Sequence, residues 1–519
     1  MIVDRLIIRK DAYFDSVFLM SLSAQLSEQG ALDVGQVVLA TAANKQLLQE
    51  LKFDAAAFEA LGPTDLIVAL RADSSEKLDA GEKLFEELLG RKNKASQQTS
   101  VHRPVGLDGA IRAMPDANLV VVSVPGVYAA YEARRAVQAG LHVMLFSDNV
   151  TVQDEIELKK EAISRGLLMM GPDCGTAILG GAMLGFANAV RPGPVGVVGA
   201  SGTGTQEVTC LVEQLGEGIS QAIGTGGRDL SEQVGGQTAL FAIDALDADP
   251  NTKVIVVISK PPAKAIADKV LDRLAKVKKP VVVHFVGAGR SDRVGNLQHA
   301  PDLAATARVA VALASGGDVG KALEQPPLPM DRVEKARKAL GKGQIALRGL
   351  FTGGTLAAEA LAYLQQAWGP MASNLGHGSP PLDKVQNKQH AIVDLGSDEF
   401  TQGRPHPMID PLPRAERLKQ EGENPNLALV LLDVVLGTGS HPDPAGAMLP
   451  AIAKVQQDAQ KRGQQVVFVT SVTGTQGDRQ GFDGQVSKLE RAGVIVMPNN
   501  MQAVRFAKAV LEGSEANHG

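Results

Sequence analysis

The sequence predicts a multi-domain α/β protein built on parallel sheets, and three observations lead to that prediction. The chain has 519 residues, which is too long for one hydrophobic core, so three or four α/β units are expected. Hydrophobic residues make up 44% of the sequence but aromatic residues only 4%, which indicates aliphatic cores like those of parallel sheets covered by helices. Apolar runs also alternate with helical stretches, as they do in βαβ units.

The first unit, residues 1–104, is predicted to be a small α/β domain with a linker. Apolar runs at 5–8, 35–40 and 65–70 alternate with helical stretches at 15–28 and 76–89. Residues 91–104 are polar and show no periodicity, so we interpret them as an exposed linker.

Residues 105–190 form the second predicted domain and show a clear strand–helix alternation. Strand patterns lie at 118–124, 141–146 and 167–170, with helices near 127–139 and 152–165. Ser147-Asp148-Asn149 follows the second strand, and Gly171 to Gly175 follow the third. Asn149 and Asp173 in these two loops are candidate substrate-binding residues.

The domains at 191–330 and 331–519 are predicted to be copies of one plan, joined at a proline-rich segment near 326. In each, a strand meets a glycine loop, a helix follows, and further strands come later. The strands of the first copy lie at 195–198, 253–258 and 280–286, and those of the second at 345–351, 427–432, 465–469 and 494–497. The second copy carries an insertion, 370–412, which is expected to be loop-like and functional.

The two glycine loops, 201–205 and 352–355, are predicted to form one anion site. Each lies between a strand and a helix, so backbone N–H groups and the positive helix end face a ligand. The alternative is a tight turn whose Ser or Thr caps the helix. The candidate phosphate-binding residues are Ser201, Gly202, Thr203, Gly353, Gly354 and Thr355.

A third glycine loop, 225–229, contributes Gly226, Gly227 and Arg228 as candidate phosphate-binding residues. An arginine in a glycine loop can hold phosphate or carboxylate through two parallel hydrogen bonds. A surface turn with an Arg228–Asp229 pair is the alternative.

Two further loops hold the candidate catalytic residues. Gly403 to Pro411 carries Arg404, His406 and Asp410 between three prolines, and rigidity suits a positioned acid–base group or a substrate clamp. His441 and Asp443 follow the strand at 427–432, and ligands of open α/β sheets bind beyond the carboxyl ends of strands. The alternative is that these side chains only satisfy backbone groups.

Composition argues against several classes of protein. The formal charge of −5 leaves no basic surplus for nucleic acid. No apolar run is long enough for a membrane span, and the start of the chain does not resemble a secretory signal. Two cysteines, Cys174 and Cys210, give neither metal-ligand spacing nor a disulfide framework. We therefore expect a cytoplasmic protein without a metal site.

Several motifs together resemble the FdrA family, often described as acyl-CoA synthetase-like, over nearly the whole chain. The motifs are Met169–Thr176, Gly199–Gly204, Ile223–Leu230 and Gly403–Pro411. The wider resemblance is to the succinyl-CoA synthetase superfamily. It implies a Rossmann-like CoA-binding-type domain at 105–190, followed by two flavodoxin-like, succinyl-CoA-synthetase-type domains with parallel sheets. The loops at Ser201 and Gly353 resemble the starts of the two helices that hold a phosphohistidine in that superfamily.

The sequence departs from that superfamily in three places. Tyr13-Phe14-Asp15-Ser16 stands where the glycine-rich CoA loop belongs. Lys260 stands about where the superfamily has a glutamate that supports the phosphohistidine, and no ATP-grasp module is visible. His299 is the single match for the phosphohistidine but lacks its flanking glycines, so we expect no phosphorylation of His299 by ATP.

The resemblance implies an acyl-CoA synthetase-like enzyme that handles an acyl phosphate or acyl-CoA. Two alternatives stay open. One is a subunit of an oxamate-type carbamoyltransferase that uses carbamoyl phosphate in purine or allantoin nitrogen catabolism. The other is a non-catalytic sensor or scaffold that binds a phosphorylated metabolite. No cofactor follows from the residues, and the resemblance implies CoA or a nucleotide bound with a partner subunit. The expected partners are a phosphorylated small molecule and other subunits or further copies of the chain.

Overall fold

A computed structural model describes residues 3–12, 14, 16–29, 32–97, 104, 106–376, 378–401 and 404–512. The chain divides into two compact units. One consists of residues 1–105 with 398–405, and the other of residues 106–397 with 406–519. Tyr13, Asp15 and Gly403 of the sequence motifs lie outside the described residues.

The N-terminal unit is an antiparallel three-stranded sheet with helices. Its elements are β1 (Val3–Arg9), α1 (Ser16–Gln29), β2 (Val34–Leu39), α2 (Ala42–Glu50), the 3-10 helix η1 (Ala55–Ala57), β3 (Leu66–Ala72), α3 (Ser75–Gln97) and α14 (Asp398–Thr401). The strand order is β1-β3-β2, with Val3 opposite Ala72 and Val34 opposite Arg71. Leu22, Leu66 and Phe85 are fully buried in its core. Helix α3 extends to Gln97, so part of the expected linker is helical.

The larger unit begins with a small parallel sheet in the order β4-β5-β6. Its elements are α4 (Leu107–Ala113), β4 (Leu119–Val122), α5 (Gly126–Gln138), β5 (His142–Leu145), α6 (Val152–Ser164) and β6 (Met169–Met170). Alanines of α5 pack on Val143 and Leu145, as the aliphatic composition predicts. The loops that carry Asn149 and Asp173 follow β5 and β6, at the carboxyl edge of this sheet.

An eight-stranded sheet follows in the order β13-β14-β12-β11-β9-β10-β7-β8. We call this sheet and its helices, residues 176–323, the first lobe. Its strands are β7 (Thr176–Leu179), β8 (Ala182–Gly185), β9 (Pro192–Ala200), β10 (Ile219–Gly224), β11 (Val254–Ser259), β12 (Val281–Phe285), β13 (Arg293–Val294) and β14 (Leu297–His299). Its helices are α7 (Gly202–Gln214), α8 (Gln237–Ala248), α9 (Lys264–Leu274), α10 (Leu303–Ser315) and α11 (Val319–Leu323). The central strands run parallel, whereas β7, β8 and β13 are antiparallel to their neighbours.

A six-stranded, fully parallel sheet completes the unit in the order β16-β17-β15-β18-β19-β20. We call it and its helices, residues 330–397 and 406–512, the second lobe. Its strands are β15 (Ala346–Phe351), β16 (Ala372–Ser373), β17 (Ala391–Asp394), β18 (Leu427–Val435), β19 (Val467–Thr473) and β20 (Ile495–Met497). Its helices are α12 (Met330–Lys338), α13 (Gly354–Trp368), η2 (Leu382–Lys384), α15 (Leu412–Gly422), α16 (Pro444–Lys461), α17 (Phe482–Arg491) and α18 (Asn500–Glu512).

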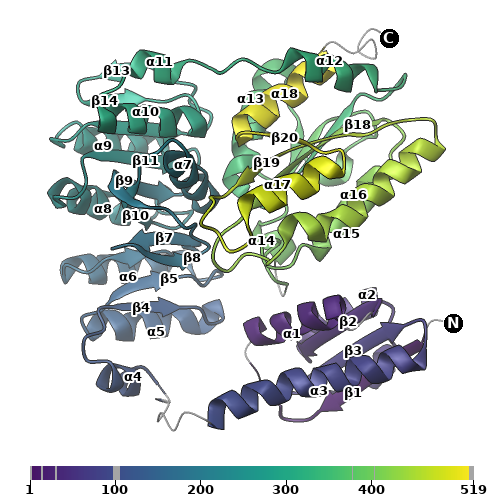
Figure 1. The fold of residues 1–519 in the computed structure, drawn as a ribbon. Helices are drawn as coiled ribbons and strands as arrows, with labels where there is room; N and C mark the ends of the chain where they lie inside the picture. Colours follow the sequence, from purple (N-terminus) through teal and green to yellow (C-terminus); the bar gives the residue numbers. More distant parts are fainter. Residues whose placement is uncertain are drawn as a thin grey trace. The chain divides into compact units, whose positions relative to one another are not determined.

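One hydrophobic core joins the two lobes. Helices α7 and α10 of the first lobe and α13 and α18 of the second contribute Val208, Leu303, Leu356 and Val504 to it. Helices α8 and α9 cover the other face of the first sheet with a separate core (Figure 1). The shared core is what brings the starts of α7 and α13 together.

The predicted α/β class with several parallel sheets is confirmed. The expectation that residues 370–412 are loop-like is wrong, because β17 in this segment is the parallel neighbour of β15. Its apolar run is only Ala391-Ile392-Val393, too short to stand out between polar and glycine residues. No helix among the described residues has both the length and the apolar character that crossing a membrane requires.

Candidate functional site

The first turns of α7 and α13 meet at the carboxyl ends of the central strands of their sheets. Ser201, which follows β9, and Thr355, in the first turn of α13, place their hydroxyl oxygens 2.6 Å apart. Both side chains are buried. Helix N-termini carry unpaired N–H groups and about half a positive charge, and the starts of two helices lie together here. The predicted meeting of the two glycine loops is thereby confirmed.

Glycine is required where the two loops touch. A Cβ on Gly204 would lie 2.9 Å from Thr355 Cγ2, and a Cβ on Gly353 would lie 2.9 Å from both Thr203 Oγ1 and Cγ2. Gly202 differs, because a Cβ there meets only Thr176 Oγ1, at 3.9 Å. The space in front of Gly202 is therefore open at the first residue of α7, where a ligand can approach the backbone.

The two loops are fixed by different groups. Ser201 caps its own helix by accepting a hydrogen bond from the Gly204 N–H at 3.1 Å. Gly353 has no side chain, and instead Asp433 of β18 accepts the N–H groups of Thr352 (2.9 Å) and Gly353 (2.8 Å). Asp433 also forms an ion pair with buried Arg414 at 2.9 Å. This carboxylate is a support for the α13 loop and has little capacity left for a ligand.

A lysine and a carboxylate flank the start of α13. A Cβ on Gly354 would lie 2.9 Å from Lys260 Nζ and 2.4 Å from Asp394 Oδ2, so both groups border the same point. Lys260 follows β11 and forms no hydrogen bond or ion pair with any described residue. Thr176 Oγ1 is buried and has no partner within the described part of the chain. A cation and a carboxylate thus lie beside the start of α13, and an unpaired hydroxyl lies near the start of α7.

Two buried glutamates stand behind the loops at equivalent positions, six residues after the capping residue of each helix. Asn500 joins them: its N–H donates to Glu207 Oε1 (3.0 Å), and its Nδ2 donates to Glu359 Oε2 (2.8 Å). Glu359 also accepts the Leu303 N–H at 2.8 Å. Burial raises the pKa of both carboxyls, that of Glu359 to about 8. A protonated Glu359 links the helices without adding negative charge behind the candidate anion site.

His406 faces the α13 loop with a fixed tautomer. Its Nδ1 accepts the Met408 N–H at 3.2 Å, so the neutral ring carries its proton on Nε2. A Cβ on Gly396 would meet both His406 Nε2 (2.5 Å) and the Thr352 carbonyl oxygen (2.6 Å). Burial lowers the pKa of His406 to about 4, against the opposing effect of the Asp433 and Asp148 carboxylates. His406 is therefore a neutral hydrogen-bond donor beside the α13 loop.

The other candidate catalytic residues are distributed over three places. Arg404 belongs to the N-terminal unit, where it pairs with Glu50. Asp410 accepts the Leu412 N–H at 3.0 Å, and burial raises the pKa of its carboxyl. His441 Nδ1 accepts the Asp443 N–H at 3.0 Å, and Asp443 caps α16 and pairs with Lys488. Their predicted catalytic roles stay predictions, while Asp443 has a structural task.

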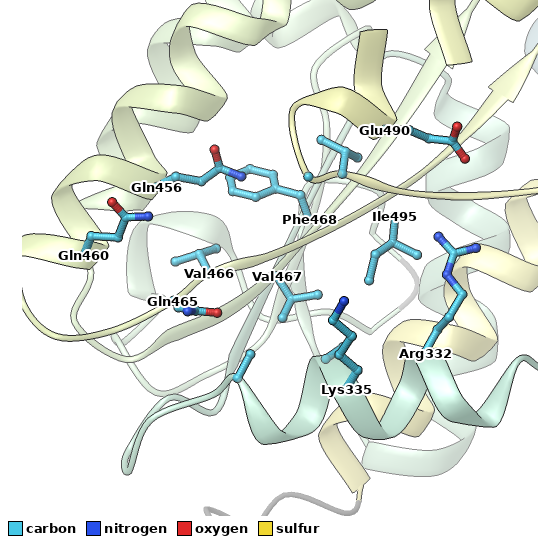
Figure 2. A pocket seen from close by; sticks show the side chains of 14 residues that line it. Arg332, Lys335, Gln456, Gln460, Gln465, Val466, Val467, Phe468, Glu490 and Ile495 are labelled. Atoms are coloured by element: carbon cyan, nitrogen blue, oxygen red, sulfur yellow. The ribbon is translucent and has the colours of Figure 1, made fainter. Parts of the chain in front are cut away.

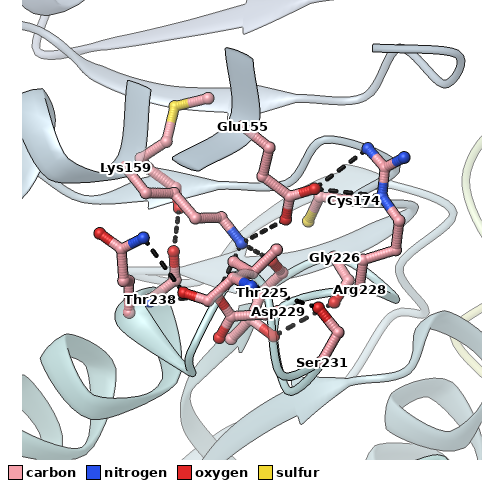
Figure 3. Close-up of polar contacts among 12 residues, drawn as sticks. Glu155, Lys159, Cys174, Thr225, Gly226, Arg228, Asp229, Ser231 and Thr238 are labelled. Atoms are coloured by element: carbon pink, nitrogen blue, oxygen red, sulfur yellow. Dashed lines mark hydrogen bonds and ion pairs between the residues drawn. The ribbon is translucent and has the colours of Figure 1, made fainter. Parts of the chain in front are cut away.

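The loop at 225–229 forms a buried ion-pair network with α6 (Figure 3). Lys159 is fully buried and bonds Glu155 (2.8 Å), Asp229 (2.7 Å) and the Thr225 carbonyl (3.0 Å). Arg228 pairs with Glu155 at 3.0 Å and not with Asp229. The alternative of an Arg228–Asp229 pair is therefore wrong, and the prediction that Arg228 binds phosphate remains untested.

Four other candidate positions lie on the loops of this region. A Cβ on Gly226 would lie 2.3 Å from the Pro172 carbonyl oxygen, so this glycine allows the loops to touch. One on Gly227 would lie 3.6 Å from Asp173 Oδ2. Asn149 and Asp173 both have positive φ, at 54° each. Such backbone is uncommon for residues other than glycine and often marks a functional turn.

The described residues contain no group of three or more His, Cys, Asp or Glu side chains arranged to hold a metal. Cys174 is buried, and burial raises the pKa of its thiol to about 12, which leaves it protonated and unreactive. His299 is also buried, and burial lowers the pKa of its imidazole.

Several residues of this site escaped the sequence reasoning. Lys260 was noted as a departure from a superfamily motif and not as a ligand, and Thr176, Asp394, Glu207 and Glu359 were not singled out. The equal spacing of the two glutamates after their glycine loops was the one signal in the sequence that could have indicated them.

Comparisons with known proteins place these features in a family. A profile described as CoA-ligase matches residues 350–510, and one described as CoA binding domain matches residues 190–287. A third, described as AllF, heavy metal-associated domain, matches residues 1–104. YahF of Escherichia coli (strain K12) is 40% identical over 517 residues, which is 99% of each chain. This chain belongs to the acyl-CoA synthetase-like family. The resemblance to the FdrA family within the succinyl-CoA synthetase superfamily is confirmed.

More distant relatives match part of the chain. The mitochondrial succinate–CoA ligase [ADP-forming] subunit alpha-2 of Trichomonas vaginalis is 32% identical over 182 residues, 33% of this chain and 57% of that protein. The subunit alpha 2 of Archaeoglobus fulgidus is 28% identical over 33% of this chain and 60% of its own. Among solved structures, the dinucleotide-forming acetyl-coenzyme A synthetase 1 of Ca. Korarchaeum cryptofilum aligns with a TM-score of 0.31 and 16% identity, covering 76% of this chain and 84% of that one.

Proposed function

We propose that this member of the acyl-CoA synthetase-like family binds the phosphoryl group of an acyl phosphate between the first turns of α7 and α13, and transfers the acyl group to an acceptor such as the thiol of CoA. The observation that carries the proposal is the 2.6 Å contact between Ser201 and Thr355, which brings the first turns of the two helices together. Lys260 and the Asp394 carboxylate lie beside Gly354 at the start of α13, and the unpaired Thr176 hydroxyl lies near Gly202 at the start of α7.

The chemistry of the site suits a phosphate leaving group. When a thiol attacks the carbonyl carbon of an acyl phosphate, the carbon–oxygen bond to phosphate breaks and the phosphate leaves with the electron pair. The thiol proton passes to water. Negative charge grows on the phosphate in the transition state, and donors fixed in advance stabilise it without reorganising. The N–H groups at the starts of α7 and α13 and the Lys260 ammonium are such donors.

His406 fits this reaction as a substrate clamp and not as a general base. Its Nδ1 is occupied by the Met408 N–H, so Nε2 presents a proton toward the α13 loop. A neutral Nε2–H can donate to an oxygen of the acyl phosphate. With a pKa of about 4, the ring keeps this form throughout the neutral pH range.

Carbamoyl phosphate is a second candidate substrate, because it is an acyl phosphate that needs the same site but no CoA. The three-stranded sheet β4-β5-β6 favours this candidate: α5 starts at Pro125-Gly126 without a glycine-rich loop. The protein would then be a subunit of an oxamate-type carbamoyltransferase, with a second subunit supplying part of the acceptor site. The third candidate is a non-catalytic sensor that binds a phosphorylated metabolite at the same site.

The test is release of phosphate from acetyl phosphate and from carbamoyl phosphate, each with CoA or with oxamate as acceptor. Turnover with CoA indicates ligase-type chemistry, turnover with oxamate indicates carbamoyl transfer, and ligand binding without turnover indicates a sensor. Lys260→Met should lower kcat/KM at least about a hundredfold, the usual cost of removing one oxyanion donor. Lys264→Met is the matched control, because the Lys264 side chain is 93% exposed and pairs with Asp268 on its own helix. Full activity of Lys260→Met would refute the proposal.

A further inference from the structure

A cavity lies at the β19–β20 edge of the six-stranded sheet. It has a volume of about 530 Å³ and is lined by the starts of β19 and β20 together with α12, α16 and the end of α17 (Figure 2). All strands of this sheet run parallel, and α13 starts beyond the carboxyl end of β15. The cavity, at the amino ends of β19 and β20, is therefore separate from the proposed phosphate site.

One wall of the cavity is cationic. Arg332 and Lys335 lie one turn apart on α12, and Figure 2 shows both side chains directed toward the cavity. Neither forms a side-chain hydrogen bond or an ion pair with the part of the chain that the structure describes. Two adjacent unpaired cations at the rim of a cavity are suited to a phosphate or carboxylate.

The opposite wall offers amide groups, and the floor is apolar. Gln456 and Gln460 lie one turn apart on α16. Gln456 donates to the Ala492 carbonyl at 3.0 Å, which leaves its amide oxygen free, and the Gln460 amide has no partner among the described residues. Val467 and Ile495 form the floor between the two walls. A ligand that fills the cavity needs an anion at one end, hydrogen-bonding groups at the other and a flat apolar body between them.

We infer that this cavity binds a nucleoside monophosphate, with the phosphate on Arg332 and Lys335 and the edge of the base on the Gln456 and Gln460 amides. The volume lies in the range of small-molecule sites, and inorganic phosphate alone would leave most of it empty. The base and sugar would cover Val467 and Ile495, and the Glu490 carboxylate at the rim can accept hydrogen bonds from the sugar hydroxyls. The inference does not depend on the proposed acyl transfer.

The test is isothermal titration of the full chain with AMP, adenosine and ribose 5-phosphate. AMP should bind about tenfold more tightly than either fragment, because each fragment meets only one wall. Arg332→Gln combined with Lys335→Gln should weaken AMP about tenfold and leave adenosine unchanged. Gln460→Leu should weaken AMP and adenosine but not ribose 5-phosphate.

Two controls separate this cavity from other sites. Lys338→Gln changes another α12 cation that does not line the cavity, so AMP affinity should not change. Lys260→Met should also leave AMP affinity unchanged, which distinguishes this cavity from the phosphate site. The inference is overturned if millimolar AMP fails to bind, if adenosine binds as tightly as AMP, or if the double α12 variant binds AMP normally.

Discussion

The loops that start α7 and α13 have similar sequences but are held in place by different means. Ser201 caps α7 with its own hydroxyl, whereas the α13 loop is held by Asp433, a carboxylate from the neighbouring strand that pairs with buried Arg414. Space is open in front of Gly202, whereas Gly353 is in contact with Thr203. The α7 start is therefore the side where a ligand can meet the backbone, and the α13 start is a rigid support beside Lys260, which follows β11 of the first lobe.

Replacing Asp433, which holds the α13 loop in place, should have the largest effect on the stability of the protein. Asp433→Asn leaves Arg414 without its counter-charge in a fully buried position and replaces an acceptor of two N–H groups by a side chain with one acceptor oxygen. We expect the free energy of unfolding to fall by about 3–5 kcal/mol, as for other broken buried ion pairs. Urea denaturation measures this loss. A loss below about 1 kcal/mol would show that the α13 loop does not depend on Asp433.

Adding a methyl group at one glycine of each loop should change stability by different amounts. Gly353→Ala places a Cβ 2.9 Å from Thr203 and 3.0 Å from Asp433, so it should cost about 1–3 kcal/mol of stability. Thr203→Ala in the same chain should recover part of that loss. Gly202→Ala, in open space at the first turn of a helix, should leave stability unchanged or raise it by up to about 1 kcal/mol. Equal losses of stability at Gly353 and Gly202 would contradict the difference described between the α13 and α7 loops.

The buried Glu359 predicts a pH effect on the stability of the protein. The pKa of Glu359 is raised to about 8 in the folded chain, where Glu207, Asp302 and Asn500 face it. A carboxyl that is protonated when folded but ionised when unfolded contributes stability that is complete below about pH 4.3, declines as the pH rises, and is lost by about pH 8.

Glu359→Gln removes this titration. Relative to that variant, the wild-type free energy of unfolding should fall by about 1.4 kcal/mol per pH unit between the two pKa values. Urea denaturation at several pH values measures the slope. Parallel curves for wild type and Glu359→Gln would show that Glu359 is ionised in the folded protein.

Loss of the α7 cap should cause the smallest of the expected losses of stability. Ser201→Ala removes the hydrogen bond to the Gly204 N–H and the contact with Thr355, at a cost of about 1 kcal/mol. Thermal unfolding detects the change, and Ser201→Thr, which keeps a hydroxyl, is the control. A loss as large as that of Asp433→Asn would mean that the two loops are supported equally.

Much of this architecture follows from the sequence, and the remainder depends on long-range pairing. Alternating strands and helices predicted most of both lobes, although β7 and β8 of the first lobe fall within the predicted domain 105–190. The repeated glycine loops predicted that residues 201–205 and 352–355 would face one another, and Ser201 and Thr355 of these loops are in contact. The role of Asp433 could not be predicted, because it depends on β18 lying next to β15, about eighty residues earlier in the chain. Thr176 reaches the site through the antiparallel pairing of β7 with β10, which no periodicity indicates.

The proline-rich loop at 403–411 also shows that long-range contacts do not follow from sequence. Its composition predicted one functional cluster, but His406 lies beside the α13 loop while Arg404 pairs with Glu50 in the N-terminal unit. Sequence shows which residues are stiffly held. It does not show which part of the fold each of them contacts, because those partners are distant in sequence: Glu50 lies 354 residues before Arg404.

The most direct test of the central claim is a crystal of the full chain soaked in selenate, a tetrahedral anion that anomalous scattering locates. The two converging helix ends predict a selenate within hydrogen-bond reach of the Gly202 and Gly354 N–H groups and Lys260 Nζ, beside the Thr176 hydroxyl. The same soak of Gly202→Val, whose side chain would fill the open space, should show no peak there. Selenate bound only elsewhere in the wild type, or a peak that persists in Gly202→Val, would contradict the claim that the two helix starts form one anion site.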